Sequence, residues 1–359
     1  MSALVVVGCA TTPQARPASP GSPSTTTSEP ARPPSPTSAP PATTTRPSAP
    51  ATSVPGPAAF GPVIVEPGAG MTPVYDFMGG ARSRLTMTMY ELADPMAEQI
   101  LTADAARGVT VQILLDSTLE GARNQPARAF LASHGVAVVM APSSRITHQK
   151  TICVDDATCL IMTLNLVTED YPDTRDVAVP DSDPADVSAI ESTFDADFSG
   201  TTAPATSDGD HLLWSPGSEP GIVGVIDGAR HSLDVENEEM DSTVVTDALI
   251  AAARRGVDVE VCMTADSSYT GALDQIVAAG GHVHLYPDSD GVLYIHEKLL
   301  LADGGTSSAV AAVGSINFST SSLDYNRELD VILTEQDAPS QIATLGAAFQ
   351  SDFDGAPAA

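Results

Sequence analysis

The segments HQKTICVD (148–155) and HEKLLLAD (296–303) follow one pattern, H-x-K-x4-D, and they decide the fold of this 359-residue chain. Of the 16 lysine and arginine residues only two are lysines, Lys150 and Lys298, and each follows a histidine by two positions. A pattern of this specificity that occurs twice indicates an internal duplication.

The duplication extends on both sides of the two motifs. At an offset of 148 residues, Gly80-Ala81-Arg82 returns as Gly228-Ala229-Arg230, and Arg107-Gly108-Val109 returns as Arg255-Gly256-Val257. After the motif the offset grows by four, so that Asn165 pairs with Asn317 and Arg175-Asp176 pairs with Arg327-Glu328. Each copy is domain-sized, so we predict a first lobe over residues 60–203 and a second over residues 204–359.

The hydrophobic periods within the first copy alternate between strand and helix. Residues 85–91 read as a strand, 94–107 as a helix that Asp94 caps, and 109–115 as a buried strand. A helix near 125–133 follows, then strands over 136–140, 151–155, 159–163 and 176–179, and a closing helix over 183–198. This order predicts an α/β fold with an α/β/α layered sheet in each copy.

The charge distribution limits the partners of the chain. Its formal net charge is −30, and residues 1–60 carry only Glu29 against three arginines, so the rest of the chain is strongly acidic. Binding to DNA or RNA by counterion release requires a basic surface, so nucleic acid is a disfavoured partner. No apolar run reaches the ~18 residues that span a bilayer.

The front of the chain has the composition of a tether. Residues 10–59 consist mainly of Pro, Ser, Thr and Ala, which cannot bury enough apolar surface to fold. Residues 1–9 end in Val6-Val7-Gly8-Cys9, which resembles a truncated lipoprotein signal with Cys9 as the lipidated residue. The segment lacks a charged leading region, so we expect the natural start to lie upstream. A lipid-anchored or secreted, extracytoplasmic protein of the cell envelope is the favoured localisation, and a chance cysteine is the alternative.

Cys153 and Cys159 flank a polar turn symmetrically. An oxidising compartment would allow a cross-strand disulfide between them, and two buried thiols are the alternative.

The duplicated motif carries the chemistry. In an extended segment, His148 and Lys150 point to one face while Gln149 points away, and the second copy repeats this. Two imidazoles and two ammonium groups around one centre suit a phosphodiester, because one imidazole can attack phosphorus while the other protonates the leaving oxygen. The lysines neutralise the non-bridging oxygens. Side chains supply the positive charge, so we expect neither a metal nor another cofactor.

The two motifs, with Gly314-Ser315-Ile316-Asn317 and Asn326-Arg327-Glu328 in the second copy, resemble the phospholipase D superfamily over about residues 62–355. The resemblance implies two lobes related by a pseudo-twofold axis, with the active site between them and a phosphohistidine intermediate. It implies that His148 is the nucleophile, His296 the general acid and base, and Asp155 and Asp303 structural. The expected catalytic residues are His148, Lys150, Asp176, His296, Lys298 and Glu328, and the expected phosphate-binding residues are Lys150, Thr163, Asn165, Lys298, Ser315 and Asn317.

Some positions depart from the pattern or leave their role open. The first copy has Met162 where the second has Gly314, and we expect Met162 to narrow the phosphate pocket. Glu91 and Glu239 recur at a strand end, where a structural and a functional role are equally compatible with the sequence. We interpret Glu236, Glu238 and Asp241 as a solvated acidic patch.

These observations favour a metal-independent phosphodiesterase that hydrolyses or transfers a phosphatidyl headgroup, anchored to a membrane by its N-terminal lipid. A surface or secreted nuclease with the same histidines is the first alternative, and an inactive lipoprotein that binds phosphate esters is the second. Both motifs lie in one chain, so no obligate oligomer is expected.

Overall fold

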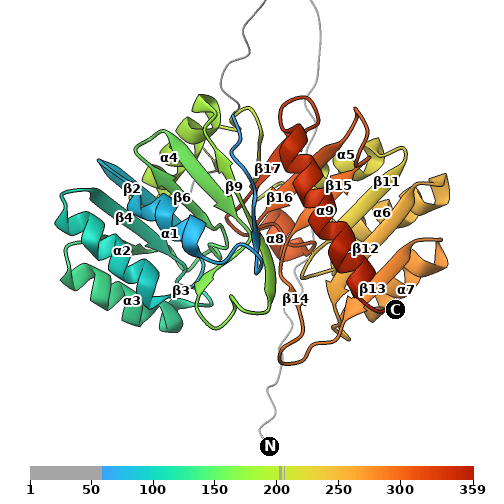
Figure 1. Cartoon of the computed structure of the whole chain (residues 1–359), viewed down its shortest axis with the longest axis horizontal. Helices are drawn as coiled ribbons and strands as arrows, with labels where there is room; N and C mark the ends of the chain where they lie inside the picture. The colour runs from blue at the N-terminus through green and yellow to red at the C-terminus, as the bar shows by residue number, and fades with distance from the viewer. Residues whose placement is uncertain (1–58, 202–203, 206) are drawn as a thin grey trace, which may run out of the picture. The chain divides into compact units, whose positions relative to one another are not determined.

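The computed structural model describes residues 59–201, 204–205 and 207–359. Cys9 and nearly all of the predicted tether lie outside these residues. The described chain contains two lobes with the same succession of elements (Figure 1). The two-lobed α/β prediction is confirmed.

The first lobe contains seven strands of one sheet, two short strands and four helices. Its elements are β1 (Ile64–Glu66), α1 (Thr72–Gly79), β2 (Arg84–Met89), β3 (Leu92–Ala93), α2 (Pro95–Ala106), β4 (Thr110–Leu115), α3 (Gly121–Ser133), β5 (Ala137–Met140), β6 (Thr151–Val154), β7 (Thr158–Met162), β8 (Leu166–Val167), β9 (Thr174–Asp181) and α4 (Pro184–Phe198).

The second lobe repeats this plan. Its elements are β10 (Leu212–Ser215), α5 (Glu219–Gly228), β11 (Ser232–Glu236), α6 (Thr243–Arg255), β12 (Asp258–Thr264), α7 (Thr270–Ala278), β13 (His282–Tyr286), β14 (Tyr294–Ile295), β15 (Leu299–Ala302), β16 (Val310–Gly314), α8 (Thr320–Asp324), β17 (Glu328–Thr334) and α9 (Pro339–Gly355).

The two large sheets have equivalent strand orders. The first runs β1-β9-β7-β6-β2-β4-β5 and the second β10-β17-β16-β15-β11-β12-β13. In each sheet one parallel set, β2-β4-β5 or β11-β12-β13, adjoins an antiparallel set that contains the motif strand, β6 or β15. The duplication read from the sequence is therefore a duplication of topology.

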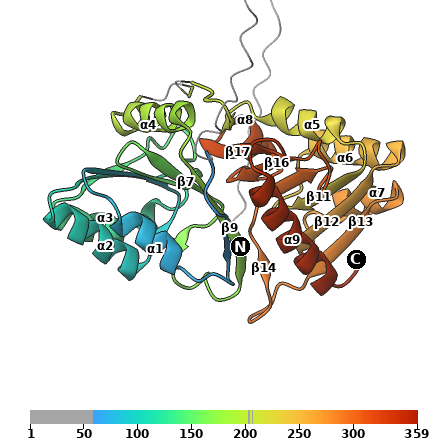
Figure 2. The ribbon, with the colours of Figure 1, turned by 45° about the horizontal axis from the view of Figure 1, so that its top comes forward.

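Helices cover both faces of each sheet, as the α/β/α prediction requires. Helices α1, α2 and α3 pack on one face of the first sheet and α4 on the other, while α5, α6 and α7 oppose α9 in the second lobe (Figure 2). The apolar core on the α4 and α9 sides is continuous from one lobe to the other, because Ile190 of α4 and Phe349 of α9 belong to one buried cluster. None of the helices in the described part of the chain is long and apolar enough to cross a membrane.

Local sequence sets the ends of these elements. Asp94 caps α2 by accepting from the backbone N–H groups of Met96 and Ala97, and Gly108 follows the helix with φ of +92°. Asp155 and Asp303 close the turns that precede β2 and β11, since each accepts three consecutive backbone N–H groups. These bonds lower the pKa of both carboxyl groups against the opposing effect of burial, to about 2 for Asp155.

A disulfide joins Cys153 on β6 to Cys159 on β7, directly opposite in the antiparallel register. The structure thus contains the first of the two alternatives that the sequence left open.

Candidate active site

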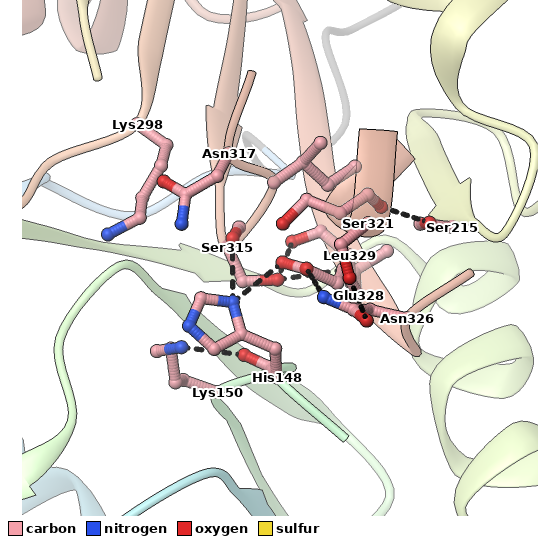
Figure 3. Close-up of polar contacts among 12 residues, drawn as sticks. His148, Lys150, Ser215, Lys298, Ser315, Asn317, Ser321, Asn326, Glu328 and Leu329 are labelled. Carbon is pink, nitrogen blue, oxygen red and sulfur yellow. Dashed lines mark hydrogen bonds and ion pairs between the residues drawn. The ribbon is translucent and has the colours of Figure 1, made fainter. Parts of the chain in front are cut away.

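The two motif histidines are held by acids from the opposite lobe. His148 Nδ1 lies 2.8 Å from Glu328 Oε2, and His296 Nδ1 lies 2.8 Å from Asp176 Oδ1. The sequence places each acid in the copy that lacks its histidine, so the pairs cross the pseudo-twofold axis. Figure 3 shows His148 with its Nδ1 directed toward Glu328 and the carbonyl of Ser315. An Nδ1 that donates to an acid leaves Nε2 as the nitrogen available for chemistry.

Backbone pairing between the lobes brings these groups together. Strand β14 pairs in parallel with β9 of the other lobe, with Ile295 opposite Arg175. At the equivalent place in the other copy, Thr147 forms a bridge with Arg327. The residues after Ile295 and Thr147 are the two histidines, and their backbone N–H groups donate to the carbonyls of Arg175 and Arg327 at 3.2 and 3.0 Å.

Two arginines, Arg175 and Arg327, bind the closing helices across the same interface. Arg327 donates from Nε to Asp197 of α4 at 2.7 Å, and Arg175 donates from Nη2 to Asp352 of α9 at 2.8 Å. Both arginines recur in the sequence beside the histidine-holding acids, and both aspartates recur in the closing helices. The repeat of the arginines was expected from the sequence, but their place at the interface and their aspartate partners were not. The signal for these ion pairs was that both copies have an arginine at one position and an aspartate at another, which are opposite charges that can pair between the lobes.

The two lysines are buried and differ in their partners. Lys150 donates to the carbonyl of His148 at 2.7 Å, and its Nζ lies 5.0 Å from the centre of the Tyr90 ring. Burial, with repulsion from Lys298, lowers the pKa of Lys150 to about 7. Lys298 Nζ lies 3.0 Å from Glu238 Oε2.

Glu238 is therefore a site residue that the sequence analysis misassigned to a solvated patch. It is half-buried in the centre of the site, whereas Glu236 of the same patch is fully buried. The patch interpretation is wrong for Glu236 and Glu238, because β11 ends at Glu236 and the next residues turn into the site, whereas Asp241 is exposed as that interpretation predicts. The signal was present in the alignment of the copies, where Glu238 is the counterpart of Tyr90 beside the repeated Glu91 and Glu239.

The amide side chains of Asn165 and Asn317 line the same cavity as the histidines, in agreement with a phosphate-binding role. Thr163 and Ser315 do not. Both are fully buried, and their hydroxyls accept from the backbone N–H groups of Val177 and Leu329 at 2.9 and 3.1 Å. These bonds fix the strands that carry Asp176 and Glu328, so both residues lie behind the acids and not against a bound phosphate.

Met162 does not narrow the cavity. It is fully buried in the core of the first lobe, opposite Ala178 on β9, while its counterpart Gly314 lies opposite Asp330 on β17. A Cβ on Gly314 would lie 2.6 Å from Asp330 Oδ1. In the first copy the large Met162 therefore lies opposite the small Ala178. In the second copy the small Gly314 lies opposite the larger Asp330.

The histidines and asparagines face one cavity of about 430 Å³ at the lobe interface. Its wall consists of Tyr90, Glu91, His148, Asn165, Asp170, Thr174, Glu238, Glu239, Tyr294, His296 and Asn317. Among the described residues, the only group with the spacing of metal ligands is Asp183, Asp186 and His211, none of which lines this cavity. The cavity can hold a phosphate ester between two imidazoles.

Comparison with known proteins agrees with this architecture. A family model described as "Cardiolipin synthase, PLD-like domain" matches residues 74–198 and 222–352, one segment in each lobe and well over half of the chain. No curated protein sequence matches the chain significantly.

Many solved structures are similar to this chain, and two of them match about four fifths of it. Polyphosphate kinase from Porphyromonas gingivalis is similar with a TM-score of 0.59 and 14% identity over 80% of this chain and 49% of that protein. The chain thus spans about half the length of that kinase. Phosphatidylserine synthase from Haemophilus influenzae Rd KW20 is similar with a TM-score of 0.56 and 12% identity, over 82% of this chain and 88% of that one.

Proposed function

Because the chain belongs to the phospholipase D superfamily, we propose that it is a phosphodiesterase that cleaves a phosphatidyl headgroup through a phosphohistidine on His148. The observation that carries this proposal is the reciprocal pairing of His148 with Glu328 and of His296 with Asp176 at 2.8 Å, around one cavity. A carboxylate holds each ring in place, and the hydrogen bond between them becomes stronger when the ring becomes positively charged.

The environment of His148 suits a nucleophile. Burial lowers its pKa, and the opposing attraction of Glu328 does not reverse this, so the ring is neutral at physiological pH. Because the Nδ1–H group donates a hydrogen bond to Glu328, the neutral ring keeps its lone pair on Nε2. This nitrogen attacks phosphorus and forms the P–N bond while the P–O bond to the leaving alcohol breaks.

The environment of His296 suits the general acid and base. Its Nδ1 faces Asp176 at 2.8 Å and its Nε2 lies 3.5 Å from Glu238 Oε2, so both nitrogens have carboxylate acceptors. A doubly protonated ring can give its Nε2 proton to the leaving oxygen. It then takes a proton from water or an alcohol, whose oxygen attacks phosphorus and breaks the P–N bond. Water gives hydrolysis and an alcohol gives transfer.

The buried lysines supply charge to the phosphate. Lys150 has a pKa of about 7, so an incoming phosphate anion favours its protonated form and gains a desolvated ion pair. Asn165 and Asn317 line the cavity, and the buried Lys150 lies behind its wall, with its Nζ 5.0 Å from the centre of the Tyr90 ring that lines it. These groups can stabilise the non-bridging oxygens in the transition state without a metal ion.

A phospholipid is favoured over a nucleic acid as the substrate. No lysine or arginine lines the cavity in the described part of the chain, whereas four carboxylates do. A nucleic-acid groove requires positive charge along the strand, and the chain as a whole is strongly acidic. Cleavage of single-stranded DNA at low salt in excess chelator, with no cleavage of phospholipid, would favour a nuclease instead.

We also propose an extracytoplasmic localisation with Cys9 as the lipid-bearing residue. The Cys153–Cys159 disulfide supports an oxidising compartment. In a bacterial host, labelled fatty acid should enter the full chain and not Cys9→Ser, and the variant should move from the membrane to the soluble fraction. Equal labelling of the two would contradict the anchor.

The enzymatic proposal is tested with the full chain and a chromogenic phosphodiester in excess chelator. We expect activity in the wild type, loss in His148→Ala and His296→Ala, and no loss in His282→Ala, whose exposed ring lies at the first residue of β13 and outside the cavity. Wild type quenched in alkaline detergent during turnover should carry an acid-labile, alkali-stable phosphoryl group that His148→Ala lacks. Activity that survives both site variants, or that chelator abolishes, would refute the mechanism.

A further inference from the structure

Glu238 occupies the place expected for phosphate oxygens in the second half of the site. Its Oε2 lies 3.0 Å from Lys298 Nζ, 3.5 Å from His296 Nε2 and 3.5 Å from Asn317 Nδ2. Its Oε1 accepts from the hydroxyl of Tyr294 at 3.0 Å. Three of these four partners are the groups that the catalytic proposal gives to the phosphate and its leaving oxygen.

The first half of the site has no such carboxylate. The counterpart of Glu238 is Tyr90, whose ring packs edge-on against His148 with 4.6 Å between ring centres and lies 5.0 Å from Lys150 Nζ. A neutral aromatic ring attracts the ammonium group without cancelling its charge. The positive charge of Lys150 is thus available to a phosphate, whereas that of Lys298 is already paired.

Glu238 stays ionised. Burial raises its pKa, but attraction from Lys298, followed by that from His296, outweighs this effect and holds the pKa well below its usual value. The carboxylate therefore does not leave Lys298 by protonation at physiological pH. A phosphodiester that enters must share Lys298 and His296 with a negative side chain or displace it, and either arrangement leaves the carboxylate in need of a cation.

The surroundings offer that cation a place. A second cavity of about 290 Å³ adjoins the first, because Glu238 and Tyr294 line both, and Asp266 and Asp288 extend its wall. In the described part of the chain neither cavity is lined by lysine or arginine. The buried side-chain oxygen of Asn317 also lacks a hydrogen-bond donor among the described residues. Several acceptors beside the phosphate position are thus open to a positively charged group.

We propose that Glu238 is a specificity-determining residue that selects zwitterionic phosphodiesters, those with an ammonium group on the alcohol side of the phosphate. This inference rests on the proposed function. The phosphate interacts with Lys150, Lys298 and the two asparagines. The ammonium group of the substrate forms an ion pair with the Glu238 carboxylate at the junction of the two cavities. A polyanion, such as a polyphosphate or single-stranded DNA, has no charge to offer that carboxylate and is rejected.

The test compares three lipids with identical acyl chains in neutral mixed micelles: phosphatidylethanolamine, phosphatidylcholine and phosphatidylglycerol. For the wild-type full chain we expect kcat/KM for the two zwitterionic lipids to exceed that for phosphatidylglycerol by about tenfold or more, as loss of one partly buried ion pair predicts. Glu238→Gln should bring the ratio close to one, mainly through a lower KM for phosphatidylglycerol. Glu219→Gln, at the start of α5, removes one charge outside both cavities and should leave the ratio unchanged.

A second variant and a binding measurement keep the two proposals separable. Glu238→Tyr reproduces the residue of the first half and should also remove the preference. Calorimetry with glycerophosphoethanolamine and glycerophosphoglycerol on His148→Ala, with and without Glu238→Gln, measures selectivity without turnover. A wild type that cleaves no phosphodiester, chromogenic or lipid, would overturn the proposed function, while the binding ratio would still decide the role of Glu238. Equal kcat/KM of the wild type for zwitterionic lipids and phosphatidylglycerol would overturn the inference. A preference for zwitterionic lipids that persists in both Glu238 variants would also overturn it.

Discussion

Replacement of Glu328 by glutamine tests the reciprocal pairing at the centre of the site. Glu328 is fully buried, accepts from His148 Nδ1 at 2.8 Å on one oxygen and from Asn326 Nδ2 at 2.9 Å on the other. A glutamine that keeps its oxygen toward Asn326 presents its NH₂ group to His148. The imidazole must then accept on Nδ1 and carry its proton on Nε2, which is the nitrogen that has to attack.

Two contributions set the size of the effect. Loss of a buried charge-assisted hydrogen bond costs about 1.5–3 kcal/mol, which corresponds to roughly 10- to 150-fold in rate. A trapped tautomer adds to this, since the equivalent change in a serine-protease triad costs up to about 10⁴-fold in kcat. We therefore expect kcat for Glu328→Gln to fall by about 10²- to 10⁴-fold, with a much smaller change in KM.

The assay measures single turnover and the amount of phosphoprotein after a quench in alkaline detergent, in which a phosphohistidine is stable. Formation of the phosphohistidine should slow in proportion to kcat. Asp330→Asn is the matched control, because Asp330 is buried two residues along β17, and burial raises the pKa of its carboxyl well above the usual value. An asparagine oxygen can keep the hydrogen bond that Asp330 Oδ1 accepts from the backbone N–H of Ile316 at 3.0 Å, so activity should stay within about twofold. A Glu328→Gln protein with a wild-type melting temperature and less than tenfold loss of kcat would refute the tautomer argument.

Three further outcomes are expected. Because the pKa of Lys150 is lowered to about 7 and its protonated form binds phosphate, kcat/KM should fall as pH rises above about 7, and a flat profile up to pH 9 would contradict this role. Arg327→Met removes the guanidinium that lies 2.7 Å from the buried Asp197, while Arg145 remains at 3.7 Å, so urea unfolding should show a loss of about 3 kcal/mol. An unchanged urea midpoint would argue against a stabilising role of the Arg327–Asp197 pair. Cys153→Ser removes a disulfide with a sequence separation of six, so its free energy of unfolding should be about 2 kcal/mol lower than that of the oxidised wild type. Reduction of the wild type should lower its stability to that of the variant, and reduction of the variant should lower it no further.

Much of the fold was predictable from one chain because the duplication supplied an internal alignment. Two copies that share positions of lysine, histidine and glycine restrict each other, so that strands 109–115 and 151–155 and the closing helix 183–198 were placed within one or two residues of the structure. The Asp94 cap and the Gly108 stop have local causes in side-chain and backbone conformation, and local causes are visible in a sequence.

The geometry between the lobes was not predictable in the same way. Each histidine and its acid could be named, but the sequence does not say whether Asp176 serves His148 or His296, because that choice depends on parallel pairing between β9 and β14. The expectation for Met162 failed for a related reason. Its burial depends on Ala178 directly across the sheet, a compensation in volume that appears only when the register of β7 and β9 is known.

The crossed pairs also bear on why both copies lie in one chain. A single lobe would have a histidine whose acid lies in its partner, so a symmetric pair of identical lobes could build the catalytic centre, but both halves would then carry the same residue at the position of Tyr90 and Glu238. Two glutamates there would neutralise both lysines, and two tyrosines would leave no carboxylate for a substrate cation. A fused duplication allows the two positions to differ. The first half then keeps the ammonium charge of Lys150 for the phosphate, and the second half has the Glu238 carboxylate for the headgroup. With the proposed role of Glu238, this asymmetry would place the substrate preference in Tyr90 and Glu238, which differ between the copies, and the chemistry in the four residues of the two crossed pairs.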